Sequence, residues 1–148
     1  MTIIAWDGTT LAADKRAIYG DSAIRTTTKI FSIDGALVGY AGQADVAEEV
    51  LTWFRSGRDP AAYPTIQRDK DFWATVLVVW PDKEIWTYER TPSPVKFCPQ
   101  TFAVGSGRDY AMTAMYLGKT AAEAVEIASL FDSSCGNGID TLTHESAA

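Results

Sequence analysis

The residue with the clearest chemical potential in this sequence is Thr2, which directly follows Met1. Removal of Met1 would leave a threonine that carries a hydroxyl and a free α-amine on the same residue. The hydroxyl is too weakly acidic to attack alone, whereas an α-amine, with a reference pKa of roughly 7.7–8.0, accepts its proton near neutral pH. Thr2 is therefore a candidate nucleophile with its own base, although many proteins begin Met-Thr without this chemistry.

Other catalytic chemistries find little support in the residue types. Cys98 and Cys135 lie far apart with no CxxC spacing, and the single histidine, His144, lies near the end of the chain. Zinc sites and Ser-His-Asp triads normally need histidine in the body of the fold, so we expect neither a metal nor a cofactor. Cys135 is not a candidate nucleophile, because no histidine is available to convert it to a thiolate.

Length and composition predict one domain. The 148 residues are 47% hydrophobic, enough for a single core, and we assign residues 1–143 to one domain and 144–148 to a polar tail. A formal charge of -6 with scattered basic residues argues against nucleic acid as a partner. No stretch approaches the ~18 apolar residues of a membrane span, and no signal-peptide pattern opens the chain, so we expect a cytoplasmic protein.

Local patterns predict the elements that must position Thr2. Asp7-Gly8 between two β-prone runs predicts an opening hairpin, and Asp34-Gly35 predicts a second one. The expected strands are 2–6, 9–13, 24–33 (with Lys29 inside), 36–41 (buried on both faces), 72–80, 84–89, 102–104 and 139–143. We expect three helices: one from Gln43 to Gly57, one from about Tyr110 to Gly118, and one that begins at a Thr120–Glu123 capping box. Residues 15–22 and 57–70 are expected connections, and the second of these is expected to contain one helical turn. This order favours a sheet-rich α+β layered domain.

Four separated segments resemble the proteasome β-subunit and HslV-like branch of the N-terminal-nucleophile (Ntn) hydrolases. Asp7-Gly-Thr-Thr-Leu-Ala-Ala-Asp-Lys-Arg-Ala17 resembles the opening hairpin of these β subunits, and residues 24–42 resemble their second hairpin. Phe102-Ala-Val-Gly-Ser-Gly107 is similar to their central turn, and residues 132–140 to their Asp-Ser-x-Ser-Gly-x-x-Ile-Asp block. The resemblance implies a four-layer αββα sandwich with the nucleophile at the edge of the cleft between the sheets.

The resemblance also implies roles for residues near Thr2. Thr2 would be the nucleophile, and its own amine the general base, directly or through a water. Lys29 would stabilise the forming alkoxide and lower the pKa of the amine, and Asp14 would pair with Lys29 and orient it. Without the resemblance, an ordinary solvated pair of strand residues is the favoured explanation of Lys29 and Asp14. Gly42 would offer its N–H as the oxyanion donor, although it also suits a plain strand-to-helix turn.

A second group of residues would hold the amine of the nucleophile. Ser106 would form a hydrogen bond with the amine of Thr2 and relay its proton, and Asp132 and the residue at position 135 would help to hold the nucleophile. Without the resemblance, the Gly-Ser-Gly segment indicates only a turn. The family has a serine where this chain has Cys135, and a thiol is a weaker donor than a hydroxyl. That arm of the network is therefore weakened unless Ser133 or Ser134 substitutes.

Three further departures from the family bear on activity. The first strand is about three residues shorter than in typical β subunits, which predicts that Thr2 stops short of the usual nucleophile position. The turn after Gly42 is one residue tighter than the family pattern. The whole chain is also shorter than a typical subunit. Separately, if Met1 is retained, the nitrogen of Thr2 is part of a peptide bond and the site is blocked.

The favoured hypothesis is a threonine-type amide-bond hydrolase, a peptidase acting on peptides or unfolded polypeptides within a homo-oligomeric ring. An ATP-dependent unfoldase is a partner by analogy alone. The first alternative is a proteolytically inactive homologue with a structural or assembly role, and a weaker one is an amidase for a small molecule. Candidate contacts between subunits are the aromatic residues Trp53, Tyr63, Phe72, Trp73 and Trp86. Whether a cation binds near the 132–138 turn is left open.

Overall fold

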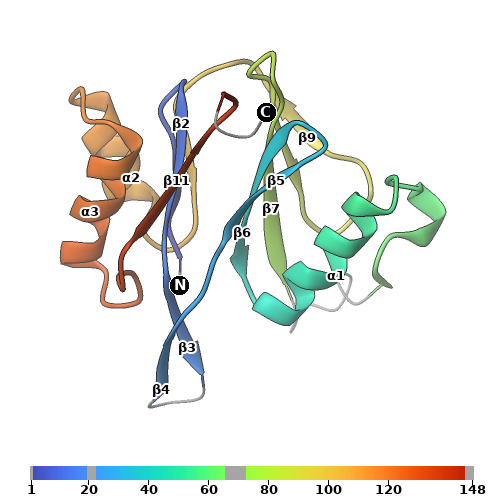
Figure 1. Cartoon of the computed structure of the whole chain (residues 1–148), viewed down its shortest axis with the longest axis horizontal. Helices are drawn as coiled ribbons and strands as arrows, with labels where there is room; N and C mark the ends of the chain where they lie inside the picture. The colour runs from blue at the N-terminus through green and yellow to red at the C-terminus, as the bar shows by residue number, and fades with distance from the viewer. Residues whose placement is uncertain (1, 20–22, 66–72, 146–148) are drawn as a thin grey trace.

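The computed structural model describes residues 2–19, 23–65 and 73–145. Two antiparallel sheets pack face to face between two helical layers, which confirms the predicted α+β αββα sandwich (Figure 1). The strands are β1 (Ile4–Trp6), β2 (Thr10–Asp14), β3 (Arg16–Tyr19), β4 (Ala23–Thr26), β5 (Ile30–Ile33), β6 (Ala36–Gly42), β7 (Ala74–Val79), β8 (Ile85–Tyr88), β9 (Val95–Phe97), β10 (Phe102–Val104) and β11 (Ile139–Thr143). The helices are α1 (Ala44–Arg55), the short 3-10 helix η1 (Pro60–Ala62), α2 (Arg108–Tyr116) and α3 (Ala121–Phe131).

The first sheet has the strand order β10-β1-β2-β11 and is built on the predicted opening hairpin. Its register pairs Ile4 with Ala13, so the base of the hairpin brings the start of β1 beside the end of β2. Both faces of β1 are buried: Ile4 and Trp6 face the second sheet, whereas Ile3 and Ala5 lie under α2 and α3. The first sheet therefore holds β1 and the residues just before it, Thr2 and Ile3, inside the sandwich.

The second sheet has the order β5-β6-β7-β8-β9 and is covered by α1. The predicted hairpin around Asp34-Gly35 is confirmed, and β6 is buried on both faces as expected. Strands β7 and β8, which lie within the expected strands 72–80 and 84–89, pair in a further antiparallel hairpin. The short strand β9 was not predicted, because the prolines at positions 92, 94 and 99 disguise it. Helix α1 and the turn η1 lie where a helix and one helical turn were expected.

A two-stranded sheet of β3 and β4 forms an arm that extends from the sandwich (Figure 1). Two predictions are wrong here. Residues 16–19 are not a loop but the first strand of the arm, and the expected strand 24–33 is divided into β4 and β5. Lys29 consequently lies just before β5 rather than inside a strand, although its carbonyl accepts a hydrogen bond from the N–H of Tyr40 (3.2 Å).

The two helical layers pack differently. Helix α1 places large side chains such as Trp53 and Phe54 against the second sheet, where Tyr63 also packs. Helices α2 and α3 place mostly alanines against the first sheet. The predicted Thr120–Glu123 capping box is present and fixes the start of α3.

The expectation that aromatic residues mark contacts between subunits is wrong for Trp53 and Tyr63, which are each only 5% exposed and lie in the core. Trp73 is exposed and Trp86 is half-buried, whereas Phe72 lies outside the described residues. His144 is not free in solvent either: its Nε2 lies 3.0 Å from the carbonyl oxygen of Val79. Among the helices of the described residues, none is long and apolar enough to cross a membrane.

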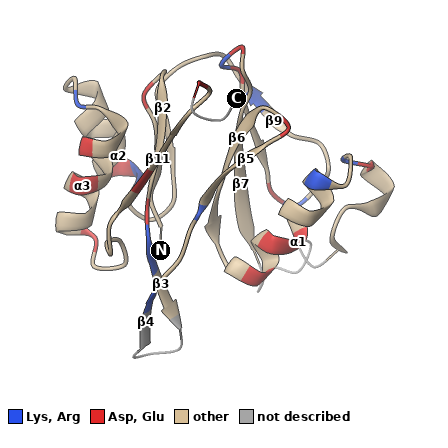
Figure 2. Ribbon diagram, viewed as in Figure 1, with Lys and Arg blue, Asp and Glu red and all other residues tan. Residues whose placement is uncertain are grey.

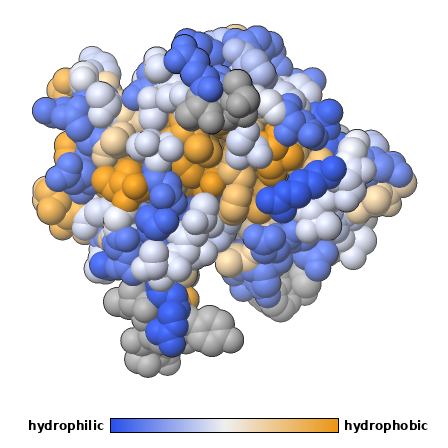
Figure 3. All heavy atoms as spheres, in the orientation of Figure 1, coloured by the Kyte–Doolittle hydropathy of each residue, from blue (hydrophilic) through white to orange (hydrophobic). Residues whose placement is uncertain are grey.

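Hydrophobic residues are also visible on the surface. In the view of Figure 3, they form a band across the middle of the molecule, over the region where the two sheets meet. In the ribbon of Figure 2, basic residues lie on the β3–β4 arm, and acidic residues lie on α1 and α3.

Candidate active site

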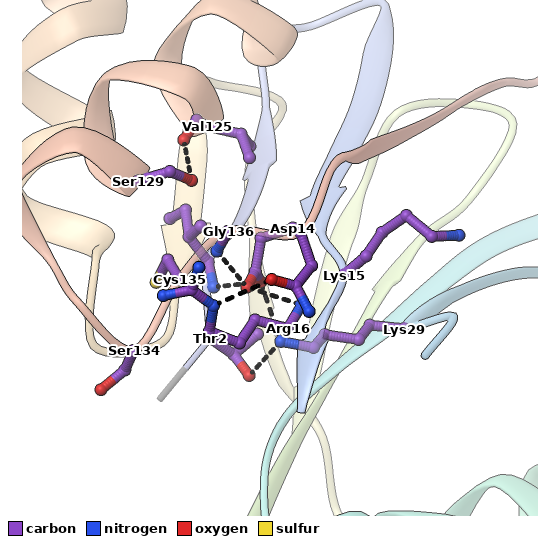
Figure 4. A network of polar contacts seen from close by, with 12 residues as sticks. Thr2, Asp14, Lys15, Arg16, Lys29, Val125, Ser129, Ser134, Cys135 and Gly136 are labelled. Atoms are coloured by element: carbon purple, nitrogen blue, oxygen red, sulfur yellow. Dashed lines mark hydrogen bonds and ion pairs between the residues drawn. The ribbon is translucent and has the colours of Figure 1, made fainter. Parts of the chain in front are cut away.

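The hydroxyl of Thr2 lies against a buried ion pair. The ammonium of Lys29 is 3.1 Å from Thr2 Oγ1 and 2.9 Å from Asp14 Oδ1 (Figure 4). All three residues are buried, with residue exposures of 3% for Thr2, 2% for Lys29 and 0% for Asp14. A cation held at hydrogen-bonding distance from a hydroxyl stabilises the alkoxide that forms when the hydroxyl loses its proton.

The carboxylate of Asp14 is satisfied on both oxygens. Oδ1 accepts from the N–H of Ile3 (3.1 Å) as well as from Lys29, and Oδ2 accepts from the N–H groups of Arg16 (3.3 Å) and Gly136 (3.1 Å). Burying an ion pair costs desolvation energy unless the remaining lone pairs find donors, and here backbone groups provide them. Asp14 is therefore held rigidly and fixes Lys29 in turn.

The short first strand does not separate Thr2 from this cluster, since its Oγ1 lies 3.1 Å from Lys29 Nζ. Its position is set by the base of the hairpin, where Asp14 N–H donates to the carbonyl of Ile3 (3.2 Å), and not by the turn end. Strands that are shorter at the turn keep the same register at the base.

A second set of contacts surrounds the backbone nitrogen of Thr2. This N–H donates to Ser106 Oγ (3.2 Å), and Ser106 Oγ donates to Asp132 Oδ2 (2.6 Å). Asp132 also accepts from the N–H of Ser134 (2.9 Å). Burial acts to raise the pKa of Asp132, but the hydrogen bonds from Ser106, Ser134 and Cys135 outweigh it and hold that pKa below its usual value.

The Gly-Ser-Gly segment brings Ser106 to this place because its backbone touches Thr2. Gly105 has φ +105°, and a Cβ there would lie 2.1 Å from the carbonyl oxygen of Thr2. The N–H of Gly107 donates to that same oxygen (3.2 Å). Glycine at position 105 is thus required by a close approach that the sequence alone presents as an ordinary turn.

Cys135 lies beside the same aspartate, with its sulfur 3.5 Å from Asp132 Oδ2 and 4.0 Å from Ser106 Oγ. Burial, followed by the nearby carboxylates of Asp14 and Asp132, raises the pKa of the Cys135 thiol to about 12. The side chain is therefore a neutral thiol at ordinary pH, which supports its exclusion as a nucleophile. The N–H of Ser134 donates to the other carboxylate oxygen of Asp132, Oδ1 (2.9 Å).

Thr2, Lys29 and Gly42 line one cavity of about 520 Å³ between the β3–β4 arm and the start of α1. Gly42 has φ +105°, and a Cβ there would lie 2.7 Å from the carbonyl oxygen of Trp73. A side chain at position 42 would therefore collide with the start of β7. The hydrogen-bond network around Thr2 contains five of the other predicted site residues, namely Asp14, Lys29, Ser106, Asp132 and Cys135. Gly42, the remaining predicted site residue, lines the same cavity as Thr2 and Lys29.

Two residues near the cavity were missed by sequence reasoning. The guanidinium of Arg16 donates to the carbonyl of Ser133 (2.6 Å) and to Asn137 Oδ1 (3.2 Å), and so fastens the 132–138 turn to the arm. Tyr40 also lines the cavity; burial raises the pKa of its hydroxyl, against a smaller opposing effect of the hydrogen bond with Thr27. Arg16 was assigned to a loop and Tyr40 to a plain buried strand, and no local signal distinguishes them.

The question of a cation near the 132–138 turn receives a partial answer. Within the described residues, no group of three or more His, Cys, Asp or Glu side chains is arranged to hold a metal ion. One backbone carbonyl of this turn, that of Ser133, accepts a hydrogen bond from the guanidinium of Arg16.

Comparison with solved structures identifies proteins that share this fold. The Thiobacillus denitrificans protein BPH matches with a TM-score of 0.65 and 20% sequence identity, over 95% of this chain and 95% of that chain. BPH in complex with epoxomicin matches with a TM-score of 0.65 and 18% identity, over 95% and 96%. Eukaryotic HslV from Trypanosoma brucei matches with a TM-score of 0.65 and 16% identity, over 95% and 97%.

The sequence matches no protein-family model and no curated protein. At identities of 16–20% the structural matches establish the fold. They confirm the resemblance to HslV-like and proteasome-like proteins at that level.

Proposed function

We propose that this chain, after removal of Met1, is a threonine-type amide-bond hydrolase that cleaves peptides. The observation that carries the proposal is the position of Lys29 Nζ, 3.1 Å from Thr2 Oγ1 and paired with the buried Asp14. Removal of Met1 is required, because only a free α-amine on Thr2 can accept a proton.

The first step forms an acyl-enzyme. The α-amine of Thr2 accepts the Oγ1 proton, and Oγ1 bonds to the carbonyl carbon of the scissile amide. The C–N bond then breaks, the proton passes from the amine to the leaving nitrogen, and an ester joins the acyl group to Thr2. Lys29 stabilises the alkoxide, and the N–H of Gly42 is the proposed donor to the oxyanion.

The second step releases the acid. The amine of Thr2 accepts a proton from water, whose oxygen attacks the ester carbon. The bond between carbon and Oγ1 breaks, and Oγ1 regains a proton from the amine. Ser106 is the proposed partner that holds the amine in both steps, because its Oγ lies 3.2 Å from the Thr2 nitrogen and is itself fixed by Asp132 Oδ2 (2.6 Å).

The proposed substrate is a peptide or an unfolded polypeptide, held in the cavity beside Thr2. We further propose that the protein acts as a homo-oligomer, as a ring that encloses this site. An ATP-dependent unfoldase as partner rests on analogy with HslV-like proteins alone.

A second candidate is an inactive homologue whose role is assembly. The observation that favours it is Cys135, because a thiol 3.5 Å from Asp132 supports the amine-holding network less well than a hydroxyl. The two candidates differ in one property, which is the reactivity of Thr2.

The test is the intact mass of the purified protein before and after incubation with a β-lactone that acylates threonine. We expect loss of Met1 and one adduct per chain, absent in Thr2→Ala and retained in Thr9→Ala, which alters a threonine in the opening turn. Epoxomicin, present in one structure of the T. denitrificans protein, is a second ligand to try. A chain that retains Met1 and gains no mass would favour the assembly role instead.

A further inference from the structure

The cavity beside Thr2 has mostly apolar walls. Ile18 on β3, Tyr40 on β6 and Ala44 at the start of α1 line it. Tyr40 is only 4% exposed and its hydroxyl already forms a hydrogen bond with Thr27, so its ring rather than its hydroxyl is available to a ligand. The volume of about 520 Å³ lies within the range of roughly 300–1,000 Å³ that is common for ligand pockets. These walls therefore suit the aliphatic part of a substrate side chain.

Three charged residues line the same cavity, namely Arg16, Lys29 and Asp45. Lys29 is paired with Asp14 (2.9 Å), and the guanidinium of Arg16 donates to the carbonyl of Ser133 (2.6 Å). Both cations are therefore held by contacts with the half of the molecule that contains the first sheet. Asp45, in contrast, belongs to α1, which covers the second sheet on the other side of the cavity.

Asp45 is the negative charge that this cavity offers to a ligand. The residue is exposed, and it belongs to none of the ion pairs found among the described residues. Its Oδ1 accepts from the N–H of Val46 (2.9 Å). Because a carboxylate can accept several hydrogen bonds, this contact leaves the group able to bind a cation.

The surroundings of Asp45 are negative as well. Asp45 also lines a neighbouring cavity of about 350 Å³ together with Glu49, so it lies where the two cavities meet. Burial raises the pKa of the Tyr40 hydroxyl against the hydrogen bond with Thr27, and the charge of Glu48 raises it further. The field of Glu48 therefore reaches the cavity wall, in keeping with the acidic residues on the ribbon of α1 (Figure 2). A cationic group on this side of the cavity meets an attractive potential.

We propose that the cavity selects peptides with lysine or arginine at the residue whose carbonyl Thr2 attacks. The aliphatic stem of that side chain lies along Ile18 and Tyr40, and its cationic head pairs with Asp45. Lysine and arginine combine these properties, because their stems cover apolar surface while their heads stay in water. Since Asp45 is exposed, the pair forms without the desolvation cost of a buried one. The inference rests on the function proposed for Thr2 and names its substrate class.

The experiment compares three peptides that differ only in the residue before the scissile bond, which is arginine, citrulline or glutamate. Citrulline has nearly the shape of arginine without its charge. Each peptide carries a fluorogenic amine as the leaving group, and kcat/KM is measured on the protein without Met1. We expect kcat/KM to be about five-fold higher for arginine than for citrulline, and lowest for glutamate. The difference between arginine and citrulline should shrink at high salt, which screens an exposed pair.

Variants of Asp45 test the residue assigned to this selection. Asp45→Asn should lower kcat/KM for the arginine peptide to the citrulline value, mainly through KM, because the contact is the same in bound substrate and transition state. Asp45→Lys should make the glutamate peptide a better substrate than the arginine peptide. The matched control is Glu126→Gln, which removes an exposed charge of the same sign from α3 and should keep the wild-type ratios.

The β-lactone adduct on Thr2 separates this inference from the proposed function. A protein that gains the adduct but hydrolyses the arginine and citrulline peptides equally well, or hydrolyses none of the three, overturns the inference and leaves Thr2 as a nucleophile. An arginine preference that persists in Asp45→Asn overturns it too. A protein that gains no adduct and cleaves no peptide overturns the proposed function, and the inference with it.

Discussion

The two helical layers of the sandwich use opposite packing strategies. Helix α1 buries its aromatic residues against the second sheet, with Trp53 and Phe54 only 5% and 1% exposed. The α2–α3 layer buries alanines against the first sheet and leaves Tyr116 and Phe131 mostly exposed. The α1 layer therefore buries its aromatic side chains against its sheet, whereas the α2–α3 layer leaves its large hydrophobic side chains on the surface.

The candidate active site joins the two halves of the molecule. The half with α2 and α3 provides Thr2, Asp14, Ser106 and Asp132, whereas Lys29 comes from the segment that enters the second sheet. The ion pair between Lys29 and Asp14 therefore acts both in the proposed chemistry and in the contact between halves. Substitutions at Lys29 and Asp14 therefore test the proposed chemistry and the contact between the two halves at the same time.

The largest effect is expected for Lys29→Met. We expect the free energy of unfolding to fall by about 3–5 kcal/mol, because Asp14 loses its buried counter-ion. The β-lactone adduct on Thr2 should also disappear. Adding Asp14→Asn to Lys29→Met should restore only part of the stability and none of the adduct, because the amide NH2 of Asn would face backbone N–H groups that the carboxylate accepted. Urea unfolding and intact mass measure the two properties, and a wild-type rate of adduct formation in Lys29→Met would show that the cation is dispensable.

The two layers should respond differently to loss of a phenylalanine ring. Phe54→Ala removes a fully buried ring from the α1 layer, and we expect a loss of about 3–5 kcal/mol in the free energy of unfolding. Phe131→Ala removes a mostly exposed ring, and we expect a change within about 0.5 kcal/mol. Similar losses for both variants in chemical denaturation would contradict the contrast between the layers.

The smallest expected difference is in the alkylation of the two cysteines, one of which lies in each half of the molecule. Cys98 follows β9 at the surface, whereas Cys135 is buried behind Thr2. Since the pKa of the Cys135 thiol is raised to about 12, its thiolate fraction stays small at pH 8 and grows only as the pH approaches that value. We expect iodoacetamide to modify Cys98 alone in the native protein at pH 8, as peptide mass mapping would show. Modification of Cys135 at the same rate would disprove the buried neutral thiol.

Much of the fold could be predicted because the signals are local. Asp7-Gly8 and Asp34-Gly35 set the two hairpins, and the Thr120–Glu123 pair set the start of α3. The predictions were wrong where the chain bends without such a signal. Residues 24–33 read as one β-prone run, but the chain leaves the arm and enters the second sheet within it. Where a strand breaks depends on the partners available in the tertiary structure, which alternation alone does not specify.

The sequence by itself determined the hairpins, the helices and the residue types of a candidate nucleophile, because turns, caps and periodicity act between neighbouring residues. Only the tertiary structure decided that Ser106, 104 positions away in the chain, contacts the nitrogen of Thr2. It likewise decided that Arg16 fastens the 132–138 turn and that the bulky side of α2 and α3 faces outward. Contacts of this kind join segments that are distant in the chain, and they form only when whole sheets and helices pack together.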